Sequence, residues 1–128
     1  MKVQSALEYF IVSSFILSVI LIGFSLAFRE SFSSVSQANI RQIDLNVQKI
    51  IFYSQSVYSQ GYPAKYTILL NFPIETKIYN ISNSLVIEYS KNKFVYPLDF
   101  KIFVNESFFG LQKIEILAEN DYVKIRKV

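Results

Sequence analysis

The side chains of this sequence that could perform chemistry are carboxylates, amines, hydroxyls and amides, because the chain contains no Cys and no His. Thiolate and imidazole metal ligands, Cys and His nucleophiles and disulfide bonds are therefore excluded. No phosphate-binding glycine loop, nucleophile elbow or metal-ligand spacing surrounds the acidic residues of the second half. We expect no enzymatic activity, no catalytic residue, no metal site and no cofactor. These acidic residues are spread over expected strand faces and turns: Glu75, Glu88, Asp99, Glu106, Glu115, Glu119 and Asp121.

The charge pattern argues against a nucleic-acid partner. The 13 basic and 10 acidic residues give a formal net charge of +3 and are mostly interspersed, with only Lys124, Arg126 and Lys127 close together. The 9 Tyr and 12 Phe have no RNA-binding motif around them, so core packing explains them better. A hydrophobic content of 52% is high for a chain of 128 residues, which indicates a membrane contribution.

One carboxylate stands apart from the others. Glu8 lies two residues ahead of the uncharged apolar run Phe10–Phe28. As a helix with about 1.5 Å of rise per residue this run is about 28 Å long, close to the hydrocarbon thickness of about 30 Å, so it can span a bilayer once. A charge inside a membrane costs up to about 2.5–3.5 kcal/mol, and less near a helix end. Glu8 either reaches the lipid headgroups from a lone helix or meets a cation in an assembled state.

Conventional signal-peptide cleavage after the apolar run is not expected. A secretory signal has an apolar region of about 7–15 residues and an A-x-A-like cut site, and neither "SLAFRES" nor "SFSSVSQ" offers one. An uncleaved signal anchor explains the hydropathy as well. Loop charge leaves the orientation open, because Lys2 favours a cytoplasmic N-terminus whereas Arg29, Arg41 and Lys49 argue weakly for the reverse.

The stretch "QSALEY" at residues 4–9, with a basic residue upstream and the apolar run downstream, resembles the class III signal peptide of archaeal type IV pilin-like proteins. That pattern is Gln-x-Ser/Ala-x-Glu followed by an aromatic or apolar residue, and Gln4, Ala6, Glu8 and Tyr9 occupy its positions. In that family a membrane-embedded prepilin peptidase cuts on the cytoplasmic side, immediately before the Gln. The resemblance therefore implies a cut between Val3 and Gln4, with Val3 standing where the family usually has Gly.

The resemblance also implies a function and partners. The chain would be a structural subunit of an archaeal type IV pilus or pilus-like adhesion filament. It would be anchored in the cell membrane as a prepilin, with its N-terminus cytoplasmic and its β domain outside. After assembly it would be part of a cell surface filament. Partners would be the prepilin peptidase, an assembly ATPase, a membrane platform protein and copies of the chain. Gln4, Glu8 and Tyr9 would form the assembly segment, in which Glu8 meets the N-terminal amine of a neighbouring subunit.

Two alternatives remain at this point. The first is a minor pilin or a membrane-anchored pilin-like binding module, which would carry the same leader. The second is a plain single-pass membrane protein, which would keep its original N-terminus.

The residues after the apolar run keep a helical rhythm. Apolar side chains recur at intervals of three or four through residues 29–60, and Gly61-Tyr62-Pro63 predicts a firm stop. We expect a bend or local melting at Gly23 and in the serine-rich stretch Ser31–Ser36. The apolar positions beyond the membrane run are Phe32, Val35, Ile40, Ile43, Val47, Ile50, Ile51 and Val57.

After Pro63 the pattern changes to a period of two, which predicts six or so short strands in a small antiparallel sheet or sandwich. So small a sheet needs a partner, and the apolar helix stripe from Ile40 to Val57 is the obvious one. The expected fold is α+β, a pilin-like lollipop with a leader at residues 1–3, a transmembrane and assembly helix at 4–28, an amphipathic continuation at 29–60 and a β domain at 61–128. The expected strand segments include "AKYTILLNF", "SLVIEYS", "LDFKIFV", "LQKIEIL" and "DYVKIRKV", the last two as a hairpin around Glu119-Asn120-Asp121.

Two sequons lie near expected turns of this β domain. Asn80-Ile81-Ser82 and Asn105-Glu106-Ser107 make Asn80 and Asn105 candidate N-glycosylation sites if the domain is extracellular. Triplets of this kind also arise often by chance.

Overall fold

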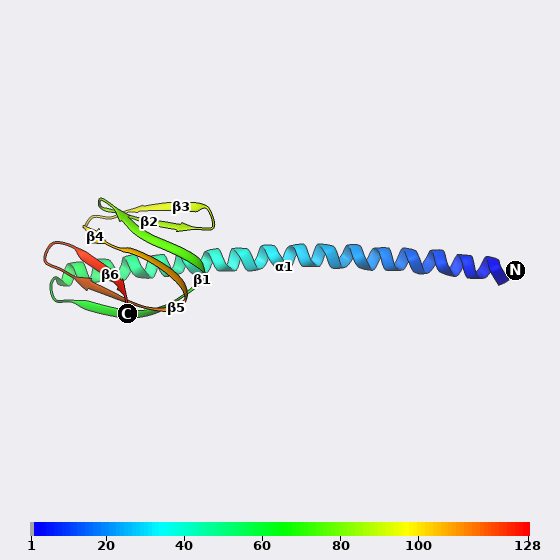
Figure 1. The fold of residues 1–128 in the computed structure, drawn as a ribbon, viewed down its shortest axis with the longest axis horizontal. Helices are drawn as coiled ribbons and strands as arrows, with labels where there is room; N and C mark the ends of the chain where they lie inside the picture. The colour runs from blue at the N-terminus through cyan, green and yellow to red at the C-terminus, as the bar shows by residue number, and fades with distance from the viewer. Residues whose placement is uncertain (1) are drawn as a thin grey trace. The chain divides into compact units, whose positions relative to one another are not determined.

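The computed structural model describes residues 2–128 and shows one long helix followed by a curled six-stranded mixed sheet, an α+β arrangement (Figure 1). The chain divides into a helical unit that ends at Ala38 and a second unit, Asn39–Val128, that contains the end of the helix and the whole sheet. The elements are α1 (Lys2–Gln60), β1 (Lys65–Ile81), β2 (Ser84–Tyr89), β3 (Asn92–Pro97), β4 (Ile102–Phe103), β5 (Asn105–Ala118) and β6 (Val123–Lys127).

Helix α1 is continuous. It runs through Gly23 and through residues 31–36, so the expected local melting there is wrong. A single Gly costs a helix only about 1 kcal/mol, and a serine less, which is too little to break a long hydrogen-bonded ladder. The predicted stop is confirmed: Gly61 adopts a φ of 75° and its N–H donates to the Val57 carbonyl oxygen at 2.9 Å. This left-handed residue is the usual helix C-cap.

The sheet has the strand order β3-β2-β1-β5-β6-β4. Neighbouring strands are antiparallel except β4 and β6, which are parallel, so the sheet is mixed rather than purely antiparallel. The β5–β6 hairpin is confirmed. Of the expected strand "LDFKIFV", only Ile102 and Phe103 pair, although Phe100, Ile102 and Val104 are buried in the alternation that was predicted.

Strand β1 is longer than expected because it continues past Pro73. Its pairing with β5 shifts between Phe72 and Thr76, where three β1 residues face only Phe109. Pro73 has no N–H to give to a ladder, and a bulge is one of the few places in a sheet that tolerates it. The bulge therefore lets one strand of 17 residues replace the short strand predicted to end at Phe72.

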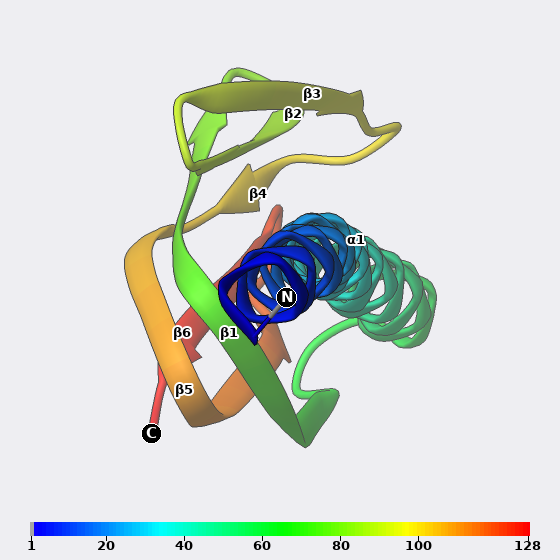
Figure 2. The ribbon, with the colours of Figure 1, turned by 90° about the vertical axis from the view of Figure 1, so that its right-hand side faces the viewer.

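The sheet curls until β4 returns to the end of β1. Asn80 N–H donates to the Val104 carbonyl oxygen at 3.2 Å, and Val104 N–H donates to Asn80 Oδ1 at 3.1 Å. Figure 2 shows the strands curled round one side of the end of α1, residues 39–60. These two contacts hold the curl closed beside Phe103 and Asn105.

The core of the second unit lies between the end of α1 and the inner face of the sheet. The helix contributes Ile43, Val47, Ile50 and Val57, each at most 1% exposed, which confirms the predicted apolar stripe from residue 43 onward. Phe72 and Phe108 stack at the centre of the sheet with ring centroids 5.1 Å apart. The other buried residues of this core that follow the helix are Leu70, Ile78, Leu85, Ile87, Tyr89, Phe100, Ile102, Val104, Ile114, Ile116, Ala118, Val123 and Ile125.

One polar residue is built into this core. Asn46 is fully buried, its Nδ2 donates to the Asn71 carbonyl oxygen at 2.7 Å, and its Oδ1 accepts from Gln42 Nε2 at 3.1 Å. A buried amide that is satisfied in only one geometry favours one helix position along the sheet. Asn46 thus joins α1 to β1 next to the Pro73 bulge.

Candidate functional site

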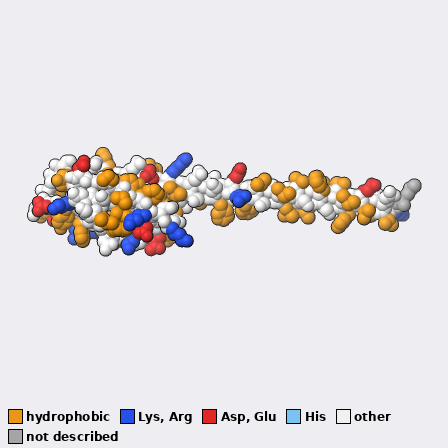
Figure 3. Space-filling model, turned by 90° about the horizontal axis from the view of Figure 1, so that it is seen from above, with side chains coloured by type: hydrophobic (Ala, Val, Ile, Leu, Met, Phe, Trp, Pro, Cys, Tyr) orange, Lys and Arg blue, Asp and Glu red, His pale blue; other side chains and the backbone are white. Residues whose placement is uncertain are grey.

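The candidate functional site is the N-terminal part of α1. Every large apolar side chain from Leu7 to Phe28 is at least half exposed, from 50% at Ile20 to 78% at Tyr9. Figure 3 shows apolar side chains along the visible face of this part of the helix. A helix that is apolar on all sides is normally covered by lipid or by other helices. α1 is long and apolar enough to cross a membrane, which is compatible with membrane anchoring.

Two serine hydroxyl groups of this segment are bonded within the helix itself. Ser13 Oγ donates to the Phe10 carbonyl oxygen at 3.0 Å, and Ser18 Oγ donates to the Ser14 carbonyl oxygen at 2.9 Å. A hydroxyl that is bonded within its own helix does not require water or a polar neighbour. These two serines can therefore lie in lipid or against another helix.

The residues of the expected cleavage site lie at the start of α1. Val3 and Gln4 belong to its first turns and are exposed, Val3 by 84%. Terminal helical turns open more readily than the helix interior. The bond between Val3 and Gln4 is thus in the part of the helix that unwinds most easily.

Glu8 has no ion-pair partner within residues 2–128. Glu8 is exposed. One helical turn before it lies Gln4, and one turn after it lie Ile11 and Val12, all of them uncharged. Tyr9 lies beside Glu8 and is also exposed.

The two candidate glycosylation sites differ in exposure and in their contacts. Asn80 is half-buried, and its carboxamide oxygen accepts the hydrogen bond from Val104 N–H. Asn105 is exposed at the start of β5, where it pairs with Tyr79. Residues that pair across a sheet share a face and neighbours along a strand alternate, so Asn105 and Asn80 project from opposite faces.

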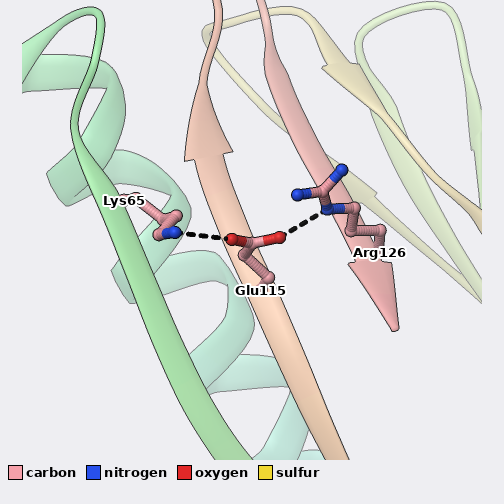
Figure 4. A network of polar contacts seen from close by, with 3 residues as sticks. All are labelled: Lys65, Glu115 and Arg126. Atoms are coloured by element: carbon pink, nitrogen blue, oxygen red, sulfur yellow. Dashed lines mark hydrogen bonds and ion pairs between the residues drawn. The ribbon is translucent and has the colours of Figure 1, made fainter. Parts of the chain in front are cut away.

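Sequence reasoning missed a polar network on the sheet (Figure 4). Glu115 on β5 lies between Lys65 on β1 and Arg126 on β6. Lys65 Nζ is 2.9 Å from Glu115 Oε1, Arg126 Nε donates to Glu115 Oε2, and the Glu115 side chain is only 7% exposed. The hydrogen bonds from Arg126 and then Lys65 lower the pKa of Glu115, and the Glu115 carboxylate raises the pKa of Arg126.

This network is structural in character. Glu115 directly faces Arg126 across the β5–β6 ladder, and the isoleucines on both sides of it point into the core. The sequence feature that indicates this network is a carboxylate between two isoleucines in the expected strand "LQKIEIL". Across residues 2–128, no three acidic side chains come close enough to hold a metal ion together.

No protein-family model, curated protein or solved structure matches this chain. A long apolar N-terminal helix followed by a small curled sheet is compatible with a pilin-like protein.

Proposed function

We propose that this chain is a structural subunit of an archaeal type IV pilus or pilus-like adhesion filament. It is made as a membrane-anchored prepilin, cut between Val3 and Gln4, and polymerised through its N-terminal helix. The observation that carries this proposal is the exposure of every large apolar side chain from Leu7 to Phe28. Lipid covers this surface in the precursor, and the helices of neighbouring subunits cover it in the filament.

The physical chemistry sets the route of assembly. Burying one large apolar side chain is worth about 1.5–3 kcal/mol relative to water, so releasing the helix into water is prohibitive. Lipid tails are as apolar as the helix surface, and helices leaving lipid gain no further hydrophobic energy by meeting each other. The helices must pass directly from lipid into a bundle, where close packing and polar contacts stabilise them. An assembly ATPase and a membrane platform protein supply this transfer.

Glu8 takes the role of a register contact. In the bundle its carboxylate meets the new amine of a neighbouring subunit's Gln4. Two unit charges 4 Å apart attract by about 4 kcal/mol at an effective dielectric of 20. Removing both from water costs a comparable amount, so the pair selects one stagger between subunits more than it adds stability.

The test is filament assembly by Glu8→Gln in the organism's own cells, with Glu30→Gln as the matched control outside the apolar run. We expect Glu8→Gln to remain in the membrane and Glu30→Gln to form filaments as wild type does. Normal filaments from Glu8→Gln would contradict the role of Glu8. Isolated wild-type filaments should contain this chain as the repeating density. Its absence from them would favour a minor pilin or a membrane-anchored binding module instead.

A further inference from the structure

Two clefts flank the contact between Asn80 and Val104, and both lie within Asn39–Val128. One has a volume of about 310 Å³ and the other about 400 Å³. Asn80 and Phe103 line both of them, so the two clefts lie next to each other at the place where the sheet closes on itself. The first continues towards Lys101 and Tyr122, and the second towards Tyr79 and Lys77.

Aromatic rings form the exposed walls of these clefts. Phe103 is 55% exposed and Tyr122 is 39% exposed, and their rings meet edge to face with centroids 6.5 Å apart. Tyr79 provides a third ring on the other side of Phe103. Exposed rings with an apolar face and a wet edge suit a ligand that has both apolar and polar faces.

The charged groups at these walls are mainly cationic. Lys77 Nζ and Lys93 Nζ lie 5.7 and 5.9 Å from the centroid of the Tyr79 ring, and Lys101 lines the other cleft. No residue that lines either cleft is acidic. Glu88 faces Lys77 in the β1–β2 ladder and Lys93 in the β2–β3 ladder, and it accepts a long hydrogen bond of 3.5 Å from the Tyr79 hydroxyl, so these three charges together leave one net positive charge beside that of Lys101. The balance favours an anionic ligand.

Amides complete the lining. Asn83 lines the first cleft and Asn105 the second, both are exposed, and the half-buried Asn80 lines both clefts. A carboxamide offers both donors and an acceptor, which matches the hydroxyl groups of a sugar. Two lining lysines are too few to follow a nucleic-acid backbone, which needs a continuous cationic groove.

We infer that these two adjacent clefts bind an acidic oligosaccharide, with sugar rings on Phe103, Tyr79 and Tyr122 and carboxylates or sulfates at Lys77 and Lys101. The inference does not depend on filament assembly, because the clefts belong to the second unit alone. The sugar chain comes either from another molecule or from a glycan on Asn105, whose side chain lies at the rim of one cleft.

The test uses the full chain in detergent micelles, produced in a host without N-glycosylation, and titrates it with an oligogalacturonate. We expect binding that weakens as salt is raised, and that falls by up to about 25-fold in Lys77→Gln/Lys101→Gln, since each exposed charge contact is worth up to about a factor of five. Tyr79→Leu should weaken binding as well. Lys49→Gln, an exposed lysine of α1, is the matched control and should bind as wild type does.

Three outcomes would overturn the inference. They are an absence of binding, equal binding of a neutral malto-oligosaccharide, and tighter binding of a single-stranded oligonucleotide. The source is separated by comparing wild type and Asn105→Gln from the organism's own cells. Equal binding by both assigns the site to sugar from another molecule, whereas binding by Asn105→Gln alone assigns it to the chain's own glycan.

Discussion

The carboxamide oxygen of Asn80 accepts a 3.1 Å hydrogen bond from Val104 N–H, while Asn80 N–H donates to the Val104 carbonyl oxygen at 3.2 Å. Asn80 belongs to β1, and Val104 follows β4, the strand at the end of the sheet order. The contact therefore closes the curl of the sheet. A residue that its sequence context marks as a glycan acceptor thus has a structural role.

Asn80→Ala should destabilise the chain. It leaves the N–H of the buried Val104 without its side-chain acceptor, and an unsatisfied buried donor costs about 1–3 kcal/mol of unfolding free energy. Urea unfolding of the full chain in detergent, followed by near-ultraviolet circular dichroism of its tyrosines, measures this. Asn83→Ala, on an exposed turn residue, is the control and should change stability little. Equal unfolding free energies of the two variants would contradict the structural role of Asn80.

Glycan occupancy should differ between the two sequons. Asn105 is exposed at the start of β5, whereas Asn80 is half-buried and held by Val104. In chain isolated from the organism's own cells, we expect a glycan on the peptide that contains Asn105 and none on the peptide that contains Asn80. Peptide mapping by mass spectrometry checks this, and Asn105→Gln should lose the whole modification. A glycan on Asn80 would show that the closure at Val104 opens before modification.

Asn46→Ala should loosen the packing of α1 on the sheet. The substitution removes the donor to the Asn71 carbonyl oxygen from a fully buried position, with an expected loss of about 1–3 kcal/mol. The same urea measurement applies, with Gln55→Ala on the exposed side of α1 as control. If Asn46→Ala were as stable as Gln55→Ala, the buried amide would not contribute to helix docking.

The Glu115 network should give stability that depends on pH. Because Arg126 and then Lys65 lower the pKa of Glu115 below its ordinary value of 4.5, the network contributes fully above that value. Its contribution is lost as pH falls through the lower folded-state pKa. Glu115→Gln should therefore have a lower melting temperature than wild type at neutral pH, and the difference should shrink below about pH 4.5. Glu75→Gln, an exposed acidic residue of β1, is the control. A difference between Glu115→Gln and wild type that stays constant from neutral pH down to acid would contradict the assignment.

The helix was predictable from the sequence because its signals are local. Apolar spacing gave its core-facing stripe, and Gly61 gave its end. The expected melting at Gly23 and at residues 31–36 failed because propensity is a weak preference beside a continuous backbone ladder.

The sheet was only partly predictable because strand pairing is not local. Alternation gave the buried residues of "LDFKIFV" correctly, yet it carries no information on the partner strand or on the parallel pairing of β4 with β6. The continuation of β1 past Pro73 was missed because a proline normally ends a ladder and the bulge that accommodates it depends on β5. Glu115 contacts Arg126 on β6, and Asn80 contacts Val104 after β4. Both contacts depend on which strands pair, so the sequence alone could not predict them.

Cleavage between Val3 and Gln4 is the step on which the filament proposal depends. Intact mass spectrometry and N-terminal peptide mapping of the chain from the organism's own cells measure it directly. We predict a mature chain that begins at Gln4, with a free amine available to pair with Glu8. A chain that keeps Met1 or Lys2 would contradict the proposal and indicate a plain single-pass membrane protein.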